Sequence, residues 1–258
     1  MIKNVFEEMA GFINDNTAFS FCVITDSQGS TPRKAGSKMI VFADGSSTGT
    51  VGGGAFEMQV QHDALEAIKT GKIITKQYQL DCDLDMQCGG SMTVYIEPFA
   101  KRPELYIFGA GHIGRELGPL ASKLGFWVTY IDERDGIFNS IEAFGATCIN
   151  TDVIKFAEQL LDNTKAYIVI ATYEHALDEA LVGILSKRKF AYIGMIGSKR
   201  KVATIKKKLI ENKGISENQV NNVDMPVGIP FRTETPFEIA LSIAARLTDI
   251  KNSCHNEA

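Results

Sequence analysis

The chain of 258 residues has 45% hydrophobic and 22% charged residues and a formal net charge of −4, which is the composition of an ordinary globular protein. The net negative charge excludes a general attraction to nucleic acid or anionic membranes. No hydrophobic run reaches the roughly 18 residues of a membrane span, and the N-terminus lacks the apolar stretch of a signal peptide. We therefore expect a cytoplasmic protein. Five scattered cysteines without a C-x-x-C pair indicate reduced thiols rather than disulfides or a four-cysteine zinc site.

Periodicity predicts a small α+β domain in the first hundred residues. Apolar residues recur at helical spacing over 3–15, and β-branched residues predict a strand over 20–25. The further elements expected here are a loop at 30–36, strands at 38–42 and 48–51, a helix at 55–69, and strands at 73–80 and 92–97.

Three features of this half suit ligand binding. The glycine-rich run 49–54 precedes a helix, so its backbone can approach a ligand closely. Arg33 has a guanidinium fork that can bind phosphate with two hydrogen bonds. Cys88 is followed by two glycines, which would leave its thiol accessible to a metal or to sulfur chemistry. Each feature also has a plain structural explanation, because glycines can simply turn the chain and most free cysteines are inert.

The segment 98–103 contains two prolines and two basic residues, which predicts a boundary between a domain over 1–101 and a domain over 102–258. Strands and helices alternate in the second half, as in a doubly wound, Rossmann-like parallel sheet with helices on both faces. The elements expected here are strands at 105–109, 127–131, 146–149, 166–171 and 190–196, an extended piece at 224–228, and a last helix over 236–249.

A G-x-G-x-x-G pattern formed by Gly109, Gly111 and Gly114 joins the first of these strands to a helix. Asp132 closes the next strand, at about the 20-residue spacing of a dinucleotide-binding βαβ unit. In such units the glycines allow a tight turn, close approach to a pyrophosphate, and close helix packing. His112 lies inside the loop, where it contacts the same ligand or is simply exposed. The pattern predicts a Rossmann domain and leaves open whether its glycines bind a dinucleotide or serve packing.

Two further segments follow strands whose carboxyl ends should meet at the ligand-binding edge of the sheet. In the first, His175 and Asp178 are either an acid–base pair or a polar helix start.

The second segment contains Gly197 and Ser198, followed by Lys199 and Arg200. Ser198 can cap the next helix, whose free N–H groups would form an anion site together with the two basic residues. The alternative is a capped helix with a solvated basic turn. The lysines at 206–208 are expected on a solvated helix face.

Eight segments together resemble the XdhC/CoxI family, accessory factors for xanthine dehydrogenase and related molybdenum hydroxylases. They occur in family order at 29–36, 52–57, 88–90, 96–98, 108–114, 192–201, 226–228 and 234–240. Such a series is far more specific than any single motif. Two positions depart from the family pattern: Ala55 stands where many relatives have a cysteine, and the run 228–233 differs from the usual glycine-rich sequence.

The resemblance implies a cofactor-binding chaperone rather than a catalyst. It implies binding of the molybdenum cofactor (molybdopterin), support for its sulfuration, and its insertion into a hydroxylase. The implied partners are a xanthine dehydrogenase-like enzyme and a sulfur donor such as a cysteine desulfurase, and we expect a homodimer. Glu57 would accept hydrogen bonds from pterin nitrogens or serve the helix dipole, and Cys88 would contact molybdenum. The residues implied around the cofactor are Arg33, Gly52, Gly53, Gly54, Glu57 and Cys88.

Two other function classes remain open. An NAD(P)-dependent oxidoreductase could use His175 and Asp178 as its acid–base pair, although the chain has no Tyr-x-x-x-Lys pair. A nucleotide-sensing module would bind NAD(P) or another nucleotide without chemistry. The nucleotide or phosphate contacts expected in either case are Gly109, Gly111, His112, Gly114, Asp132, His175, Gly197, Ser198, Lys199 and Arg200.

Overall fold

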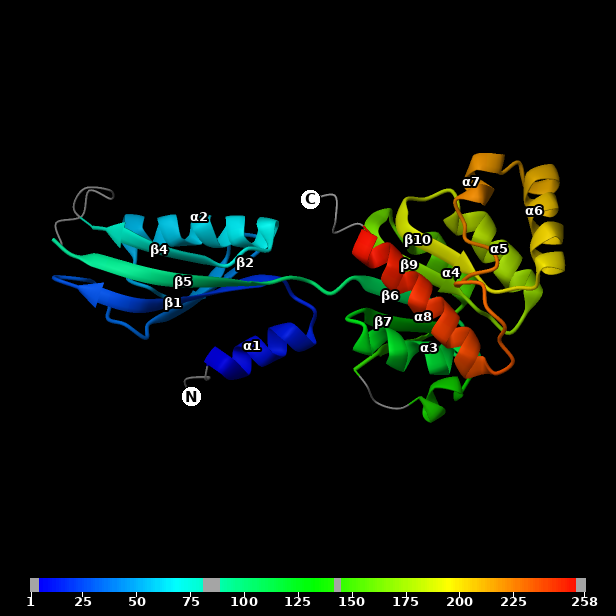
Figure 1. Cartoon of the computed structure of the whole chain (residues 1–258), viewed down its shortest axis with the longest axis horizontal. Helices are drawn as coiled ribbons and strands as arrows, with labels where there is room; N and C mark the ends of the chain where they lie inside the picture. Colours follow the sequence, from blue (N-terminus) through cyan, green and yellow to red (C-terminus); the bar gives the residue numbers. More distant parts are fainter. Residues whose placement is uncertain (1–4, 81–88, 142–144, 254–258) are drawn as a thin grey trace. The chain divides into compact units, whose positions relative to one another are not determined.

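The computed structural model describes residues 5–80, 89–141 and 145–253. The chain divides into two compact units, Met1–Lys101 and Arg102–Ala258 (Figure 1). The first is a small α+β unit and the second has a parallel sheet with helices on both faces, which confirms the predicted fold class. None of the helices in the described ranges has both the length and the hydropathy needed to cross a membrane.

The N-terminal unit is built on an antiparallel sheet with the strand order β3-β2-β1-β5-β4. Its elements are α1 (Val5–Asn14), β1 (Phe19–Gln28), β2 (Lys38–Phe42), β3 (Ser47–Gly49), α2 (Gly54–Thr70), β4 (Ile74–Gln79) and β5 (Ser91–Phe99). Alternate residues of β5, including Val94 and Ile96, are buried against α2 because successive side chains of a strand point to opposite faces. Aromatic contacts of Phe12 with Phe19 and Phe42 hold α1 on the other face.

Strand β5 enters the segment that the sequence suggested as a linker. It continues through Pro98, which pairs with Ser20 of β1. On its other side, β4 begins at Ile74, opposite Ile96, so β5 has no partner strand there beyond Ile96. Beyond that point β5 is an edge strand, where a residue without an N–H group is tolerated.

The C-terminal unit contains a parallel sheet with the order β10-β9-β6-β7-β8. Its elements are β6 (Glu104–Phe108), α3 (His112–Lys123), β7 (Trp127–Asp132), the 3-10 helix η1 (Ile137–Ser140), β8 (Thr147–Asn150), α4 (Val153–Gln159), β9 (Asn163–Ile170), α5 (His175–Leu185), β10 (Phe190–Met195), α6 (Lys199–Lys213), α7 (Glu217–Asn221) and α8 (Pro236–Ser253). One face packs on α3 and α8, and the other on α4, α5 and α6 (Figure 1). The strand order reverses at β6, which therefore marks the switch point where such sheets bind ligands.

Candidate functional site

The predicted motifs of the N-terminal unit meet beside the end of β1. A Cβ atom added to Gly52 would lie 2.8 Å from Cγ of Pro32, so the glycine run packs on the loop that carries Arg33. A Cβ atom on Gly90 would lie 2.6 Å from the carbonyl oxygen of Gln28. Arg33 is exposed. Cys88 lies outside the described residues, so its expected contact with molybdenum stays a prediction.

The carboxylate of Glu57 accepts hydrogen bonds from the backbone N–H groups of the glycine run. Its Oε2 accepts hydrogen bonds from the backbone N–H groups of Val51 (3.1 Å), Gly52 (3.3 Å) and Gly53 (3.0 Å), and from the hydroxyl of Thr50. Burial raises the pKa of Glu57, but these hydrogen bonds outweigh it and leave the pKa below its ordinary value.

The backbone N–H groups of Val51, Gly52 and Gly53 are thus bound by the chain's own carboxylate, since Glu57 lies in the first turn of α2. The cofactor contact expected of the glycine run stays a prediction. Among the described residues, Oε1 of Glu57 has no hydrogen-bond partner, so this oxygen can still accept from a ligand. Gly54 begins α2 itself.

The three glycines of the G-x-G-x-x-G pattern have different roles. Gly109 has a φ of 112°, and a Cβ atom there would overlap the carbonyl oxygen of Ala171. A Cβ atom on Gly114 would overlap the carbonyl oxygen of Gly109. At Gly111 the nearest atom to an added Cβ is Nη2 of Arg134, at an ordinary 3.7 Å. Packing therefore requires the first and third glycines. The second has open space beside it, which would let a ligand approach the protein backbone closely.

Asp132 ends β7 with its carboxylate already saturated by the protein. The residue is 1% exposed. Its Oδ2 accepts from the N–H of Ala110 (2.8 Å) and from Nη2 of Arg134 (2.7 Å), while Oδ1 accepts from Nε (2.9 Å) and the backbone N–H (3.1 Å) of Arg134. Burial raises the pKa of Asp132, but these hydrogen bonds have the larger effect and leave the pKa below its ordinary value. Each carboxylate oxygen of Asp132 thus already accepts two hydrogen bonds within the protein, and the nucleotide contact expected of this residue stays a prediction.

Arg134 was missed from the sequence. Its guanidinium binds Asp132 with two hydrogen bonds and lies 4.7 Å from the ring centroid of Tyr173, in the loop after β9. The available signal was an arginine two residues after the acidic strand end, where Rossmann proteins can place a phosphate-binding arginine. His112, at the start of α3, is exposed.

His175 and Asp178 do not form the acid–base pair that was one interpretation of the sequence. Asp178 lies on the buried side of α5, where it is 1% exposed. Its Oδ2 is 2.7 Å from Nζ of Lys201, and its Oδ1 accepts from the hydroxyl (2.6 Å) and N–H (3.1 Å) of Thr172. His175 lies at the first position of the helix with an exposed side chain.

Ser198 caps α6 as predicted, accepting a hydrogen bond from the N–H of Lys201 at 3.2 Å. Lys199 and Arg200 are exposed in the first turn. Gly197, Ser198 and Lys199 line a pocket of about 890 Å³ that also contains residues of the loop 224–233 and of α8. Ser198 lines a second pocket as well, together with Arg200.

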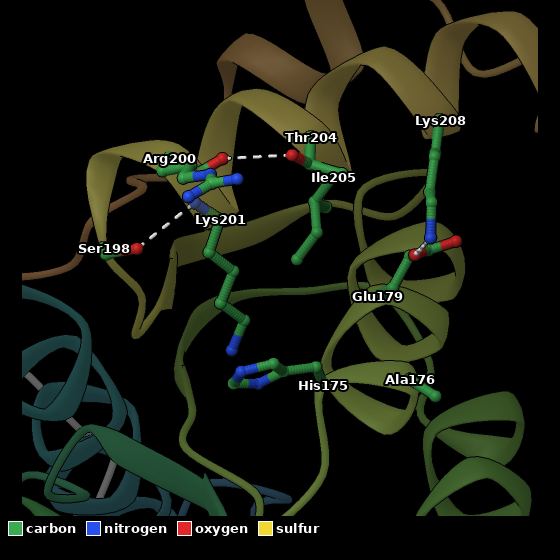
Figure 2. Close-up of a pocket in the computed structure, with 9 residues that line it drawn as sticks. All are labelled: His175, Ala176, Glu179, Ser198, Arg200, Lys201, Thr204, Ile205 and Lys208. Atoms are coloured by element: carbon green, nitrogen blue, oxygen red, sulfur yellow. Dashed lines mark hydrogen bonds and ion pairs between the residues drawn. The ribbon is translucent and has the colours of Figure 1, made fainter.

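This second pocket, of about 410 Å³, lies between α5 and α6 (Figure 2). It brings together His175 of α5 and Arg200, Lys201 and Lys208 of α6. The side chain of Lys208 is exposed, as expected for 206–208, but it also lines this pocket, with its Nζ 3.2 Å from Oε2 of Glu179. The missed signal was the spacing of seven residues between Lys201 and Lys208, which puts both on one side of a helix.

Comparison with known proteins identifies the family. Residues 105–247 match the XdhC Rossmann domain, and residues 12–79 match the XdhC and CoxI family. The chain belongs to the XdhC family. The expected resemblance is therefore confirmed, and each matched region falls within one of the two units of this XdhC-family protein.

Similar proteins include two curated relatives and one solved structure. The protein YqeB of Escherichia coli (strain K12) is 33% identical over 256 residues, which cover 97% of this chain and 47% of YqeB. A probable xanthine dehydrogenase subunit of Bacillus subtilis (strain 168) is 28% identical over 158 residues, which cover 60% of this chain and 44% of that protein. The chain thus spans about half the length of these curated relatives. The crystal structure of a xanthine dehydrogenase from Bacillus halodurans has the same fold, with 20% identity, a TM-score of 0.51 and 96% of each chain covered.

Two cysteines of this XdhC-family protein lie among the described residues. Cys22 is buried, which raises the pKa of its thiol to about 12, and Cys148 is exposed. No group of three His, Cys, Asp or Glu side chains within 5–80, 89–141 and 145–253 could hold a metal ion.

Proposed function

We propose that this protein is an accessory factor that binds the molybdenum cofactor, supports its sulfuration and inserts it into a xanthine dehydrogenase-like hydroxylase. One observation carries the proposal: both units match the same family, at 12–79 and 105–247. The name of the Bacillus subtilis relative supports a xanthine dehydrogenase as the partner. A cysteine desulfurase or a similar enzyme would supply the sulfur.

The residues of the N-terminal unit fit part of this cofactor. Molybdopterin presents N–H donors on its pterin ring and carries a phosphate group. Oε1 of Glu57 is held in place by the hydrogen bonds to Oε2, so it could accept a pterin N–H without further ordering. The N–H groups of Gly52 and Gly53 are not available to the phosphate while Glu57 binds them. We therefore assign the phosphate to the exposed guanidinium of Arg33.

The test is the molybdenum and pterin content of the full chain, purified anaerobically from a host that makes the cofactor. We expect near-stoichiometric contents in the wild type and a loss of about tenfold in Arg33→Ala and in Cys88→Ser. Lys72→Ala is the matched control, because it removes the same charge from an exposed position of the same unit. Absence of both components from the wild type, or full pterin content in both variants, would contradict the proposal.

For the Rossmann unit we propose a second ligand, NAD(P) or a related nucleotide. The supporting observation is the open space at Gly111 between two glycines that packing requires. We expect saturable binding of NADP or NAD that Gly111→Ala weakens about tenfold, while Gly11→Ala, at a position with no neighbour within 4 Å of the added Cβ, has no effect. Turnover of a small carbonyl substrate would favour an oxidoreductase. A ligand-dependent change in sedimentation would favour a sensor and would also test the expected homodimer.

A further inference from the structure

The pocket between α5 and α6 is built from two helix ends that the sheet places together. Strands β9 and β10 are parallel neighbours, with Ile170 opposite Met195. Each helix begins a few residues after its strand, so both amino ends lie at the same edge of the sheet. The pocket of about 410 Å³ has a volume typical of small-molecule sites, which range over roughly 300–1,000 Å³.

One cationic side chain of this pocket has no anionic partner among the described residues. Its lining contains the cations Arg200, Lys201 and Lys208 and one carboxylate, Glu179. Lys208 pairs with Glu179, and Lys201 pairs with Asp178 beneath the pocket. Arg200 forms no ion pair with any residue that the structure describes. The site therefore has one excess positive charge, carried by the side chain that best matches the oxygens of a phosphate.

Lys201 supplies a donor that is already fixed in place. Its Nζ donates to Oδ2 of Asp178 (2.7 Å) and to the carbonyl oxygen of Ile196 (3.4 Å). An ammonium group has three donors, so one remains for a ligand. Figure 2 shows this nitrogen at the base of the pocket, beside the imidazole of His175. Because the Lys201 side chain is only 13% exposed, a hydrogen bond from it to an anion is weakly screened by water.

We propose that this pocket binds the phosphate group of a small phosphate monoester. A tetrahedral dianion needs donors from several directions, and here they come from Arg200 and Lys201 on α6 and from His175 on α5. A planar carboxylate would use fewer of them. The rest of the pocket accommodates the organic part of the ligand. The inference does not depend on the proposed role in cofactor maturation, because it rests on a different unit of the chain.

Calorimetric titration of the full chain at constant ionic strength tests the proposal, with ribose 5-phosphate, inorganic phosphate and ribose as probes. We expect saturable binding of ribose 5-phosphate and none of ribose. Arg200→Ala should weaken binding about tenfold, because it removes a charge-assisted contact, and Arg200→Lys should restore part of it. Lys207→Ala removes the same charge from α6 at a position outside the pocket lining, and should leave the affinity unchanged.

The outcomes separate the possible ligands. Equal affinity for inorganic phosphate and ribose 5-phosphate would assign the pocket to free phosphate and overturn the organic part of the proposal. Equal losses in Arg200→Ala and Lys207→Ala would mean a general charge effect, and absence of saturable binding would mean no site. Either result would overturn the proposal entirely. Arg200 is exposed, so circular dichroism should show an unchanged fold in its variants.

Discussion

Lys201 of α6 places its Nζ 2.7 Å from Oδ2 of Asp178 on α5, and this ion pair joins the helices that follow two adjacent strands. The carboxylate side chain is 1% exposed and the lysine side chain 13%. Removing one partner of such a pair leaves the other charge buried without compensation, which costs more than the pair itself contributes.

We predict that Lys201→Met lowers the free energy of unfolding by about 3 kcal/mol at neutral pH. Urea denaturation followed by the fluorescence of Trp127 measures this, because the only tryptophan of the chain lies in β7 of the same unit. Lys207→Met is the control, since that side chain is 72% exposed. A loss below about 1 kcal/mol would mean that water, rather than Lys201, solvates Asp178.

The carboxylate of Glu57 should make the stability of the N-terminal unit depend on pH. Its pKa in the folded protein lies below the ordinary 4.5. Its contribution is therefore fully present above about pH 4.5 and is lost as the pH falls through the folded pKa.

Glu57→Gln should accordingly lower the free energy of unfolding by about 1 kcal/mol at pH 7 and by much less at pH 3. Denaturation followed by far-ultraviolet circular dichroism at both pH values measures the difference. Glu66→Gln, on the same helix, is the charge-matched control. An equal loss of unfolding free energy at pH 7 and pH 3 would show that the negative charge of Glu57 does not contribute to its binding of the glycine run.

Arg134 should stabilise the folded protein through Asp132. Arg134→Ala leaves the buried carboxylate with the N–H of Ala110 and its own loop, so we expect a loss of about 2 kcal/mol at pH 7. Arg134→Lys keeps the charge but not the forked geometry and should lose about half as much. The folded pKa of Asp132 is lowered, so the effect of Arg134→Ala should shrink as the pH falls below the ordinary 3.8. Unfolding monitored through Trp127 at pH 7 and pH 3 checks both statements, and an effect independent of pH would contradict them.

The glycines of the Rossmann loop should respond differently to alanine. Gly114→Ala forces a Cβ atom into the carbonyl oxygen of Gly109, and we expect a loss of about 3 kcal/mol or failure to fold. Gly111→Ala meets no close atom and should lose only about 0.5–1 kcal/mol, as a poorer N-cap of α3. Melting temperatures of the two variants test this ranking. Equal losses would mean that the second glycine also serves packing.

Much of the fold could be predicted because its signals are local. The helix over 236–249 and the strand over 127–131 appear within a few residues of their expected ends, since side-chain periodicity reports directly on which face is buried. The strand preceding the glycine loop was recognised in the same way. The place of Pro98 in β5 could not be predicted from local sequence. It depends on a non-local feature, namely that the pairing of β4 with β5 does not extend beyond Ile96.

The sequence predicted the positions of the candidate site's segments more accurately than the contacts of their side chains. Because the strands are parallel, the segments after β6, β9 and β10 were expected at one edge, and the structure places them there. The partners of their side chains were not predictable. Asp178 binds a lysine 23 residues away in sequence rather than the nearby His175.

The two-part α/β organisation, the positions of the glycine turns and the family could be predicted, because they depend on spacing along the chain. Which polar groups are already hydrogen-bonded within the protein became visible in the folded structure: Glu57 binds the glycine run, Asp132 binds Arg134, and Asp178 binds Lys201. The physical reason is that burial strengthens a hydrogen bond or an ion pair only where packing brings both groups together and excludes water, and spacing alone does not specify that packing.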